Sequence, residues 1–182
     1  MAAGTDRLFV ALDLPGQARA ALAAFRDAAD PRIWRPVPDA ALHVTLVFLG
    51  HWPAGVSERV GEVVRANAGP AADLALGSAL LLPPRRARVL CAEVHDGSGA
   101  LAALQARTAQ ALGAAGLHEP ERRPYRPHAT VARLRAGERS PRAVAVEGPE
   151  PVAFAGEAVT LYRSLLSRAG ARYEPLARVE VG

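Results

Sequence analysis

The sequence predicts a domain of the α+β or α/β class, for two reasons. Short apolar runs with strand-like alternation are separated by two or three segments of helical spacing, and further strands follow in the last third of the chain. In addition, the tripeptide His-x-Thr occurs twice, at residues 43–45 and 128–130. Its separation of 85 residues (128 − 43) is nearly half of the 182-residue chain, which indicates an internal duplication.

The first part of the chain predicts strands and helices in alternation. An alternating apolar strand at 7–14 stops at a proline, and a helix at 17–29 follows and ends at an Asp-Pro step. The first His-x-Thr run forms a strand at 41–49, ended by a glycine. Valines at helical spacing, followed by Gly-Pro, indicate a second helix at 56–68.

The middle of the chain predicts a hairpin and a third helix. Strands at 74–82 and 89–95 flank a basic turn at 83–88. A turn rich in glycine then leads into an alanine-rich helix at about 101–115.

The last third predicts the second motif strand and a closing set of short strands. An irregular, charged loop at 116–127 leads into the His-x-Thr strand at 128–134, and 141–151 is expected to be an exposed connection. The closing strands are expected at 152–155, 158–166 and 173–181.

Composition favours a folded protein with an anionic partner. Half of the residues are hydrophobic, which argues against disorder. All 22 basic residues are arginine, the net charge is +4 and the pI is about 10.2. Arginine holds phosphate through a planar, bidentate fork, so a nucleic-acid or nucleotide partner is one interpretation. The absence of lysine beside abundant alanine leaves a purely compositional cause open.

Cysteine content and hydropathy exclude several classes. The single cysteine, Cys91, excludes an internal disulfide and a cysteine-based zinc cluster, and we expect it to be buried and inert. The N-terminal stretch lacks the pattern of a secretory signal, and no apolar run reaches membrane-spanning length. We therefore expect a cytoplasmic protein without membrane contact, and further expect a monomer without cofactor.

The repeated motif supplies a candidate acid and base. Because side chains alternate between the two faces of a strand, His43 and Thr45 share a face, as do His128 and Thr130. Two imidazoles facing one cleft can take and give protons near neutral pH. The threonine hydroxyls can bind an anionic oxygen held between them, and this set of groups fits phosphodiester chemistry.

Other interpretations of these residue types carry less weight. A single histidine in a strand is usually packed or solvated, and threonine is common in strands, but the repetition favours chemistry. Paired histidines also bind zinc, yet neither strand carries a third ligand at suitable spacing, so no metal site is predicted. His51, His95 and His118 lack a repeated context and are expected in turns or on the surface.

Four stretches carry a family resemblance: RLFVALDLP near the start, LHVTLVFLG around His43, RPHATVAR around His128, and LYRS followed by Gly170 and Tyr173. With them the chain resembles the two-histidine (2H) phosphoesterases, and most closely the RNA 2′,3′-cyclic phosphodiesterases once called 2′-5′ RNA ligases. Ala129 stands where that family often has a bulkier residue. The resemblance implies an α+β fold, with residues 1–182 as a single bilobal domain. Its two pseudo-symmetric lobes of antiparallel sheet, with outer helices, would surround a central cleft and contribute one motif each.

The resemblance also implies metal-independent hydrolysis of an RNA 2′,3′-cyclic phosphate end to a 2′-phosphate. By position in the motif, His43 would be the general acid that protonates the leaving 3′ oxygen, and His128 the general base that deprotonates water. Thr45 and Thr130 would stabilise the anion. Two alternatives stay open: a 2H phosphoesterase acting on small cyclic nucleotides or 2′-5′ linked oligonucleotides, and a non-catalytic RNA-binding module.

Arginines near the second motif are candidate phosphate contacts. Arg133 ends RPHATVAR, but its odd offset of five from His128 sends it to the opposite face of an ideal strand. A β-bulge or a strand end is therefore required if Arg133 reaches the phosphate. Arg126 is expected to position RNA phosphate or to cover the surface, and the arginines of 83–88 and 122–126 to form an RNA-tracking rim.

Aromatic residues near the motifs are candidates for the core or for base stacking. Tyr125, in the loop before the second motif strand, is expected to stack on a terminal base. Phe9 and Phe48 are expected in the core, with substrate contact as the alternative. Trp34 is expected to cap either the cleft or the core.

Overall fold

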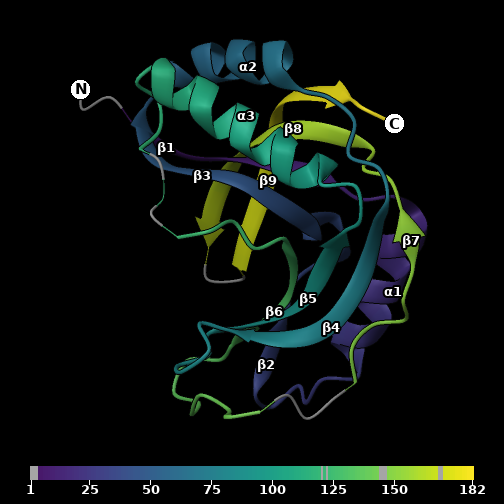
Figure 1. Ribbon diagram of the computed structural model, residues 1–182. Coiled ribbons are helices and arrows are strands. Elements are labelled where there is room, and N and C mark those ends of the chain that lie inside the picture. Colours follow the sequence, from purple (N-terminus) through teal and green to yellow (C-terminus); the bar gives the residue numbers. More distant parts are fainter. Residues whose placement is uncertain (1–3, 120, 122, 144–146, 168–169) are drawn as a thin grey trace.

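The backbone forms one curled, antiparallel sheet covered by three α-helices, as seen in a computed structural model that describes residues 4–119, 121, 123–143, 147–167 and 170–182 (Figure 1). Every described strand pairing is antiparallel. Parallel crossovers are the mark of α/β proteins, so the fold is α+β.

The elements follow the predicted order along the chain. The helices are α1 (Gly16–Asp27), α2 (Val56–Asn67) and α3 (Ala100–Ala114). The strands are β1 (Thr5–Asp13), β2 (Trp34–Pro36), β3 (His43–Pro53), β4 (Leu74–Leu82), β5 (Val89–Asp96), β6 (His128–Leu134), β7 (Ala153–Phe154), β8 (Ala158–Ser167) and β9 (Gly170–Glu180).

The sheet consists of two halves that meet at the motif strands. Its order is β7-β4-β5-β6-β3-β1-β8-β9, with β2 paired to β6. The strands β3 and β6 share one register pair, Val44 opposite Ala129, and the strand pairs within each half are far longer. In Figure 1, α2 and α3 lie side by side over the half that contains β1, β3, β8 and β9, and α1 lies against the other half. Each half therefore carries one His-x-Thr motif at its inner edge.

Differences from the predicted elements are small and have local causes. Strand β2 is not predicted from the sequence, because a segment of three residues that ends in Pro36 is too short to show alternation. This strand sets Trp34 in the core at 7% exposure, which decides between its two expected places. The strand expected at 152–155 is only Ala153–Phe154. Residues 144–146 of the predicted connection and Arg122 of the predicted rim lie outside the described residues.

None of the helices in the described residues has both the length and the apolar character required to cross a membrane.

Candidate active site

The two His-x-Thr motifs are direct neighbours across the sheet. Val44 and Ala129, the middle residues of the motifs, pair with one another and are fully buried. Their flanking residues lie on the other face of the strands and are partly exposed. Since β3 and β6 run antiparallel, His43 lies on the side of Thr130, and Thr45 on the side of His128. The fold thus brings the four predicted residues onto one face.

Both imidazole rings are oriented by the same backbone contact. Nδ1 of His43 lies 2.8 Å from the carbonyl oxygen of Ala41, and Nδ1 of His128 lies 2.7 Å from that of Arg126. A carbonyl only accepts hydrogen bonds, so Nδ1 donates in each ring and Nε2 is the basic nitrogen of the neutral form. Nε2 of His43 lies 3.1 Å from Oγ1 of Thr45. Nε2 is therefore the nitrogen available for proton transfer in both residues.

A β-bulge in β6 brings Arg133 to the cleft. Thr130 and Ala132 pair with two consecutive residues of β5, so Val131 has no partner of its own in that register. Val131 and Ala132 are both buried, and Arg133 is exposed. The extra residue reverses the alternation, so Arg133 shares the face of Thr130. The β-bulge that Arg133 requires in order to reach the face of His128 is therefore present.

The same irregularity occurs at the same offset in β3. Thr45 and Val47 pair with consecutive residues of β1, and Leu46 is left between them. Phe48, five residues after His43, therefore returns to the cleft face and is 42% exposed. The expectation of a core position is wrong for Phe48, because the bulge places two buried residues in succession before it.

His43 sits among three aromatic rings. The ring of Phe9 stacks on it at 5.0 Å between centroids, Tyr173 contacts it edge-on at 5.4 Å, and Tyr162 lies at 6.3 Å. Phe9 is 4% exposed, as expected of a core residue, and its ring also lines the cavity. Burial among these rings is the largest effect on His43 and lowers its pKa to about 4.

Charges around His43 modify this effect in both directions. The hydrogen bond to the Ala41 carbonyl and the negative charge of Asp13 raise the pKa of His43, whereas the positive charges of Arg133 and His128 lower it. Asp13 is the cross-strand partner of His43 in the pairing of β1 with β3.

Asp13 in turn anchors the strands behind His43. Its carboxylate accepts hydrogen bonds from Tyr162 Oη and Thr160 Oγ1, both at 2.8 Å, and from Nε of Arg178 at 3.3 Å. Burial and the Asp13 charge raise the pKa of Tyr162, which keeps its phenol protonated. The carboxylate thus fixes one of the rings that enclose His43.

A cavity of about 260 Å³ opens beside the motifs. Its polar lining includes His43, Thr45, Thr130 and three arginines, Arg7, Arg35 and Arg133. Arg35 is the cross-strand partner of Arg133. Arg7 lies over the ring of Phe48, with its guanidinium carbon 4.9 Å from the ring centroid. This concentration of positive charge and hydroxyl groups suits an anion of the size of a phosphate ester.

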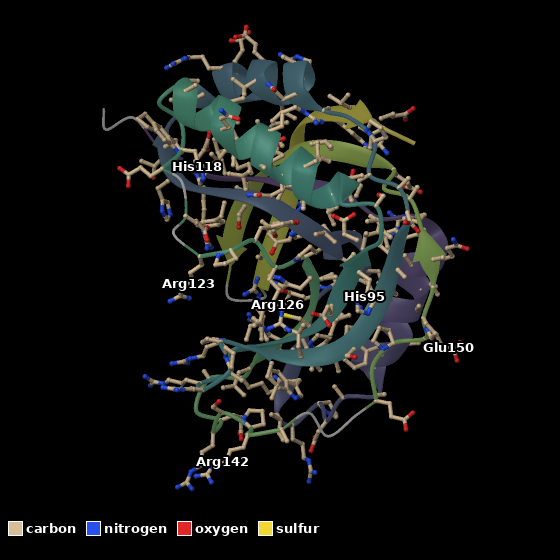
Figure 2. All side chains as sticks on the ribbon, viewed as in Figure 1. His95, His118, Arg123, Arg126, Arg142 and Glu150 are labelled. Atoms are coloured by element: carbon tan, nitrogen blue, oxygen red, sulfur yellow. The ribbon has the colours of Figure 1, made fainter. Side chains whose placement is uncertain are left out.

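A larger groove of about 840 Å³ adjoins this cavity on the side of His128. Thr45 and Phe48 line both, and the rest of the groove lies between the tip of the β4–β5 hairpin and the segment that joins α3 to β6. Arg88, Arg123 and Arg126 contribute positive charge to it. Figure 2 shows Arg123 and Arg126 with His118 along this segment.

The residues just before the second motif have definite contacts in the groove. The Tyr125 hydroxyl donates a hydrogen bond to the Thr45 carbonyl at 3.1 Å, so its ring is fixed against β3. The Arg126 guanidinium lies 3.3 Å from Glu93, and its carbonyl orients His128. Both residues line the groove, where contact with a bound strand stays a prediction.

The remaining cysteine and histidine residues are buried or lie at the surface. Cys91 is fully buried with Sγ 3.6 Å from Thr130 Oγ1, and burial raises the pKa of its thiol to about 11, as expected of an inert residue. His51 and His95 are exposed, and His118 is partly buried at the groove. Across the described ranges, no group of three or more His, Cys, Asp or Glu side chains is placed to hold a metal ion.

Several residues that surround the motifs are not predicted from the sequence. Asp13 and Arg35 lie in stretches that were assigned no chemistry, and Arg35 belongs to the strand that was not predicted. Tyr173 was part of the resemblance without a role, and Tyr162 lies in the LYRS stretch. The alternation of Thr160, Tyr162 and Ser164 along β8 is the one local signal of a shared face, although it does not tell which strand that face meets.

Comparison with known proteins gives consistent matches. The family model of the 2′-5′ RNA ligase superfamily matches residues 14–168. An RNA 2′,3′-cyclic phosphodiesterase of Aeropyrum pernix is 26% identical over 151 residues, which cover 80% of this chain and 85% of that protein.

Solved structures extend the likeness to the whole chain. The crystal structure of LigT from E. coli, complexed with 3′-AMP, superposes with a TM-score of 0.80 at 26% identity, covering 98% of this chain and 99% of LigT. TT0787 of Thermus thermophilus gives a TM-score of 0.69 at 31% identity, with 96% and 97% coverage.

Proposed function

The chain belongs to the 2′-5′ RNA ligase superfamily, the 2H phosphoesterases, and from this premise we propose that it hydrolyses RNA 2′,3′-cyclic phosphate ends to 2′-phosphates without a metal ion. One observation carries the proposal. The two His-x-Thr motifs meet at the Val44–Ala129 pair, and both imidazoles have Nδ1 bound to a carbonyl. Two basic Nε2 atoms are thereby available on one face. The name of the Aeropyrum relative is the second support.

The chemistry needs two proton transfers on opposite sides of one phosphorus atom. Water attacks the phosphorus as Nε2 of His128 takes its proton, and the bond from phosphorus to the 3′ oxygen breaks. Nε2 of His43 gives its proton to that oxygen. The product keeps the phosphate on the 2′ oxygen and has a free 3′ hydroxyl. Each transfer contributes roughly 10²- to 10⁴-fold to the rate of such reactions.

The phosphate is held by groups from both motif strands. The hydroxyls of Thr45 and Thr130 donate to the non-bridging oxygens, and the forked guanidinium of Arg133 binds the same anion. Phe48 offers its exposed face to the terminal base, with Arg7 over the ring.

The acid role of His43 depends on the substrate. Burial lowers the pKa of His43 to about 4, so the ring is neutral at pH 7 and its Nε2 carries no proton to donate. A bound phosphate diester brings a negative charge next to the ring and raises this pKa. Substrate binding therefore favours protonation of His43 at Nε2, which is the proton that the acid donates.

A second candidate function is action on 2′-5′ linked oligonucleotides. In that reaction the 5′ oxygen of the next nucleotide stands where water stands in the hydrolysis, on the side of His128. The groove of about 840 Å³ beside His128 favours this candidate, since about 10–15 Å³ of such volume is enough for one water molecule.

The test is an incubation of the protein, in the presence of a chelator, with an RNA that ends in a 2′,3′-cyclic phosphate. The proposal expects turnover to a 2′-phosphate, identified by phosphorus NMR, with a bell-shaped dependence of kcat on pH. The variants His43→Ala and His128→Ala should bind the RNA and fail to turn it over. Absence of turnover by the wild type, or a 3′-phosphate product, would contradict the proposal.

A further inference from the structure

Two arginines stand opposite one another at the cavity. Arg35 of β2 and Arg133 of β6 are cross-strand partners, both are exposed, and both line the cavity that contains His43. Like charges in directly opposite positions repel and destabilise a sheet. Such an arrangement is tolerated where an anion binds between or beside the two charges.

These two arginines also differ from five other arginines of the protein. Arg26, Arg32, Arg126, Arg163 and Arg178 all form salt bridges with carboxylates. Within the part of the chain that the structure describes, neither Arg35 nor Arg133 has a carboxylate within salt-bridge distance. Their positive charges are left for a ligand.

One cyclic phosphate does not need both guanidinium groups. It carries a single negative charge on two non-bridging oxygens. Thr45, Thr130 and a bidentate Arg133 supply about four donors to those oxygens, which is close to their capacity. Arg35 is thus in excess of what the reacting group can bind.

The two arginines also differ in their effect on the pKa of His43. The charge of Arg133 lowers the pKa of His43, and the other charges that shift it are those of Asp13 and His128. Arg35 is not among them. Of the two arginines, Arg133 is therefore the one whose charge acts on His43.

We propose that Arg35 binds a second phosphate of the substrate, the one on the 5′ side of the terminal nucleotide. The inference rests on the proposed function and narrows it. In an RNA end, this is the other phosphate bonded to the terminal nucleoside, so it is the nearest second anion. The preferred substrate is then an oligonucleotide, or a nucleotide with a 5′-phosphate, and a cyclic mononucleoside phosphate is a poor one.

Three substrates separate the second phosphate from the first. Adenosine 2′,3′-cyclic phosphate has only the reacting group, the dinucleotide ApA with a 2′,3′-cyclic phosphate end has one phosphate more, and the same dinucleotide with a methylphosphonate linkage has that group without its charge. For the wild type, we expect kcat/KM on the charged dinucleotide to exceed that on the mononucleotide by about tenfold or more. The neutral linkage should remove most of this advantage.

Variants then show which residue is responsible for the higher kcat/KM on the charged dinucleotide. In Arg35→Gln, the ratio of kcat/KM on the charged dinucleotide to kcat/KM on the mononucleotide should fall. It should come close to the ratio that the wild type shows between the methylphosphonate dinucleotide and the mononucleotide. Arg133→Gln should lower kcat/KM on both substrates and keep the ratio. Arg32→Gln, an exposed arginine three residues before Arg35 and paired with Asp30, is the matched control and should keep the wild-type ratio. If Arg35→Gln lowers kcat/KM by the same factor on the charged dinucleotide and on the mononucleotide, Arg35 binds the reacting phosphate and the proposal is overturned.

Failure of the proposed function would be recognised separately. If the wild type turns over none of the three substrates, calorimetric binding replaces kinetics. The ligands are then adenosine 3′-phosphate and the dinucleotide ApA with a 3′-phosphate end. Selective loss of the dinucleotide's tighter binding in Arg35→Gln supports the second phosphate site, and a retained difference in Kd overturns it.

Discussion

Two features of the surroundings of His43 shift its pKa in opposite directions. Its aromatic surroundings of Phe9, Tyr162 and Tyr173 lower the pKa, whereas the nearby Asp13 carboxylate raises it. Burial dominates, so the ring is neutral until an anion enters the cavity. If His43 is the general acid, it therefore gains its proton only when an anion binds, and it does not donate a proton to other acceptors before that.

The first prediction concerns the proton that His43 gains. Sulfate, whose charge does not change near neutral pH, should bind in the cavity with uptake of protons at pH 7, because a pKa near 4 in the free protein rises in the complex. Titration calorimetry in buffers of different ionisation enthalpy measures the uptake. His43→Gln is the control and should abolish most of it. Sulfate binding by the wild type without proton uptake would remove His43 from the acid role.

The second prediction concerns Asp13. Asp13→Asn removes the negative charge that favours protonated His43, so the pKa of His43 in the sulfate complex should fall. Tyr162→Phe removes one hydrogen bond to the carboxylate and keeps its charge, so it should change the pKa much less. NMR titration of the His43 ring in both variants measures the difference. Equal pKa values in wild type and Asp13→Asn would show that the carboxylate has no electrostatic part in the site.

At the scale of the strand, one bulge after each motif decides which residues face the cavity. Alternation alone predicts the placement of His43, Thr45, His128 and Thr130, and it holds for all four. It fails at Val47 and at Ala132, four residues after each histidine, because each of them is buried directly after another buried residue. A bulge depends on the pairing of neighbouring strands, so a single sequence can show that one is required, as for Arg133, without showing that it exists.

The third prediction follows from the bulge in β6. Arg133→Gln should lower kcat/KM by roughly 10- to 100-fold, the usual effect of losing a charge-assisted contact with an anion. The thermal midpoint should change little, since the side chain is exposed and has no salt bridge among the described residues. Arg135→Gln serves as the control, because Arg135 binds the Pro31 carbonyl. Equal kcat/KM for Arg133→Gln and wild type would mean that Arg133 does not contact the phosphate.

At the scale of the molecule, the sequence predicts the order of elements more fully than the surroundings of the site. Local patterns define the helices and the long strands, and the repeated motif implies two halves. The residues around His43 come from β1, β8 and β9, which are far apart in the sequence and meet only through the sheet order. Arg35 was overlooked because β2 is too short for any periodic pattern.

The fourth prediction links His43 to the stability of the whole fold. A histidine whose pKa falls from about 6.5 in the unfolded chain to about 4 in the folded protein binds more protons when unfolded. The free energy of unfolding should therefore rise with pH between about 4 and 6.5, by at most about 1.4 kcal/mol per pH unit from this group. Urea denaturation across this range, compared with His43→Gln, isolates the contribution. Parallel curves for the two proteins would contradict a His43 ring that is held neutral in the folded protein.

If two histidines, one from each half, divide the acid and base roles between them, a substrate with sulfur in place of the 3′ oxygen should remove the need for only one of the two. A thiolate leaves without a proton, so the acid is no longer needed, whereas water must still be deprotonated. The rate of opening of this cyclic phosphorothiolate is measured for wild type, His43→Ala and His128→Ala. We expect the sulfur to restore most of the rate lost in His43→Ala and little of that lost in His128→Ala. Restoration of the His128 variant instead would reverse the two roles, and restoration of neither would contradict acid and base catalysis by this pair.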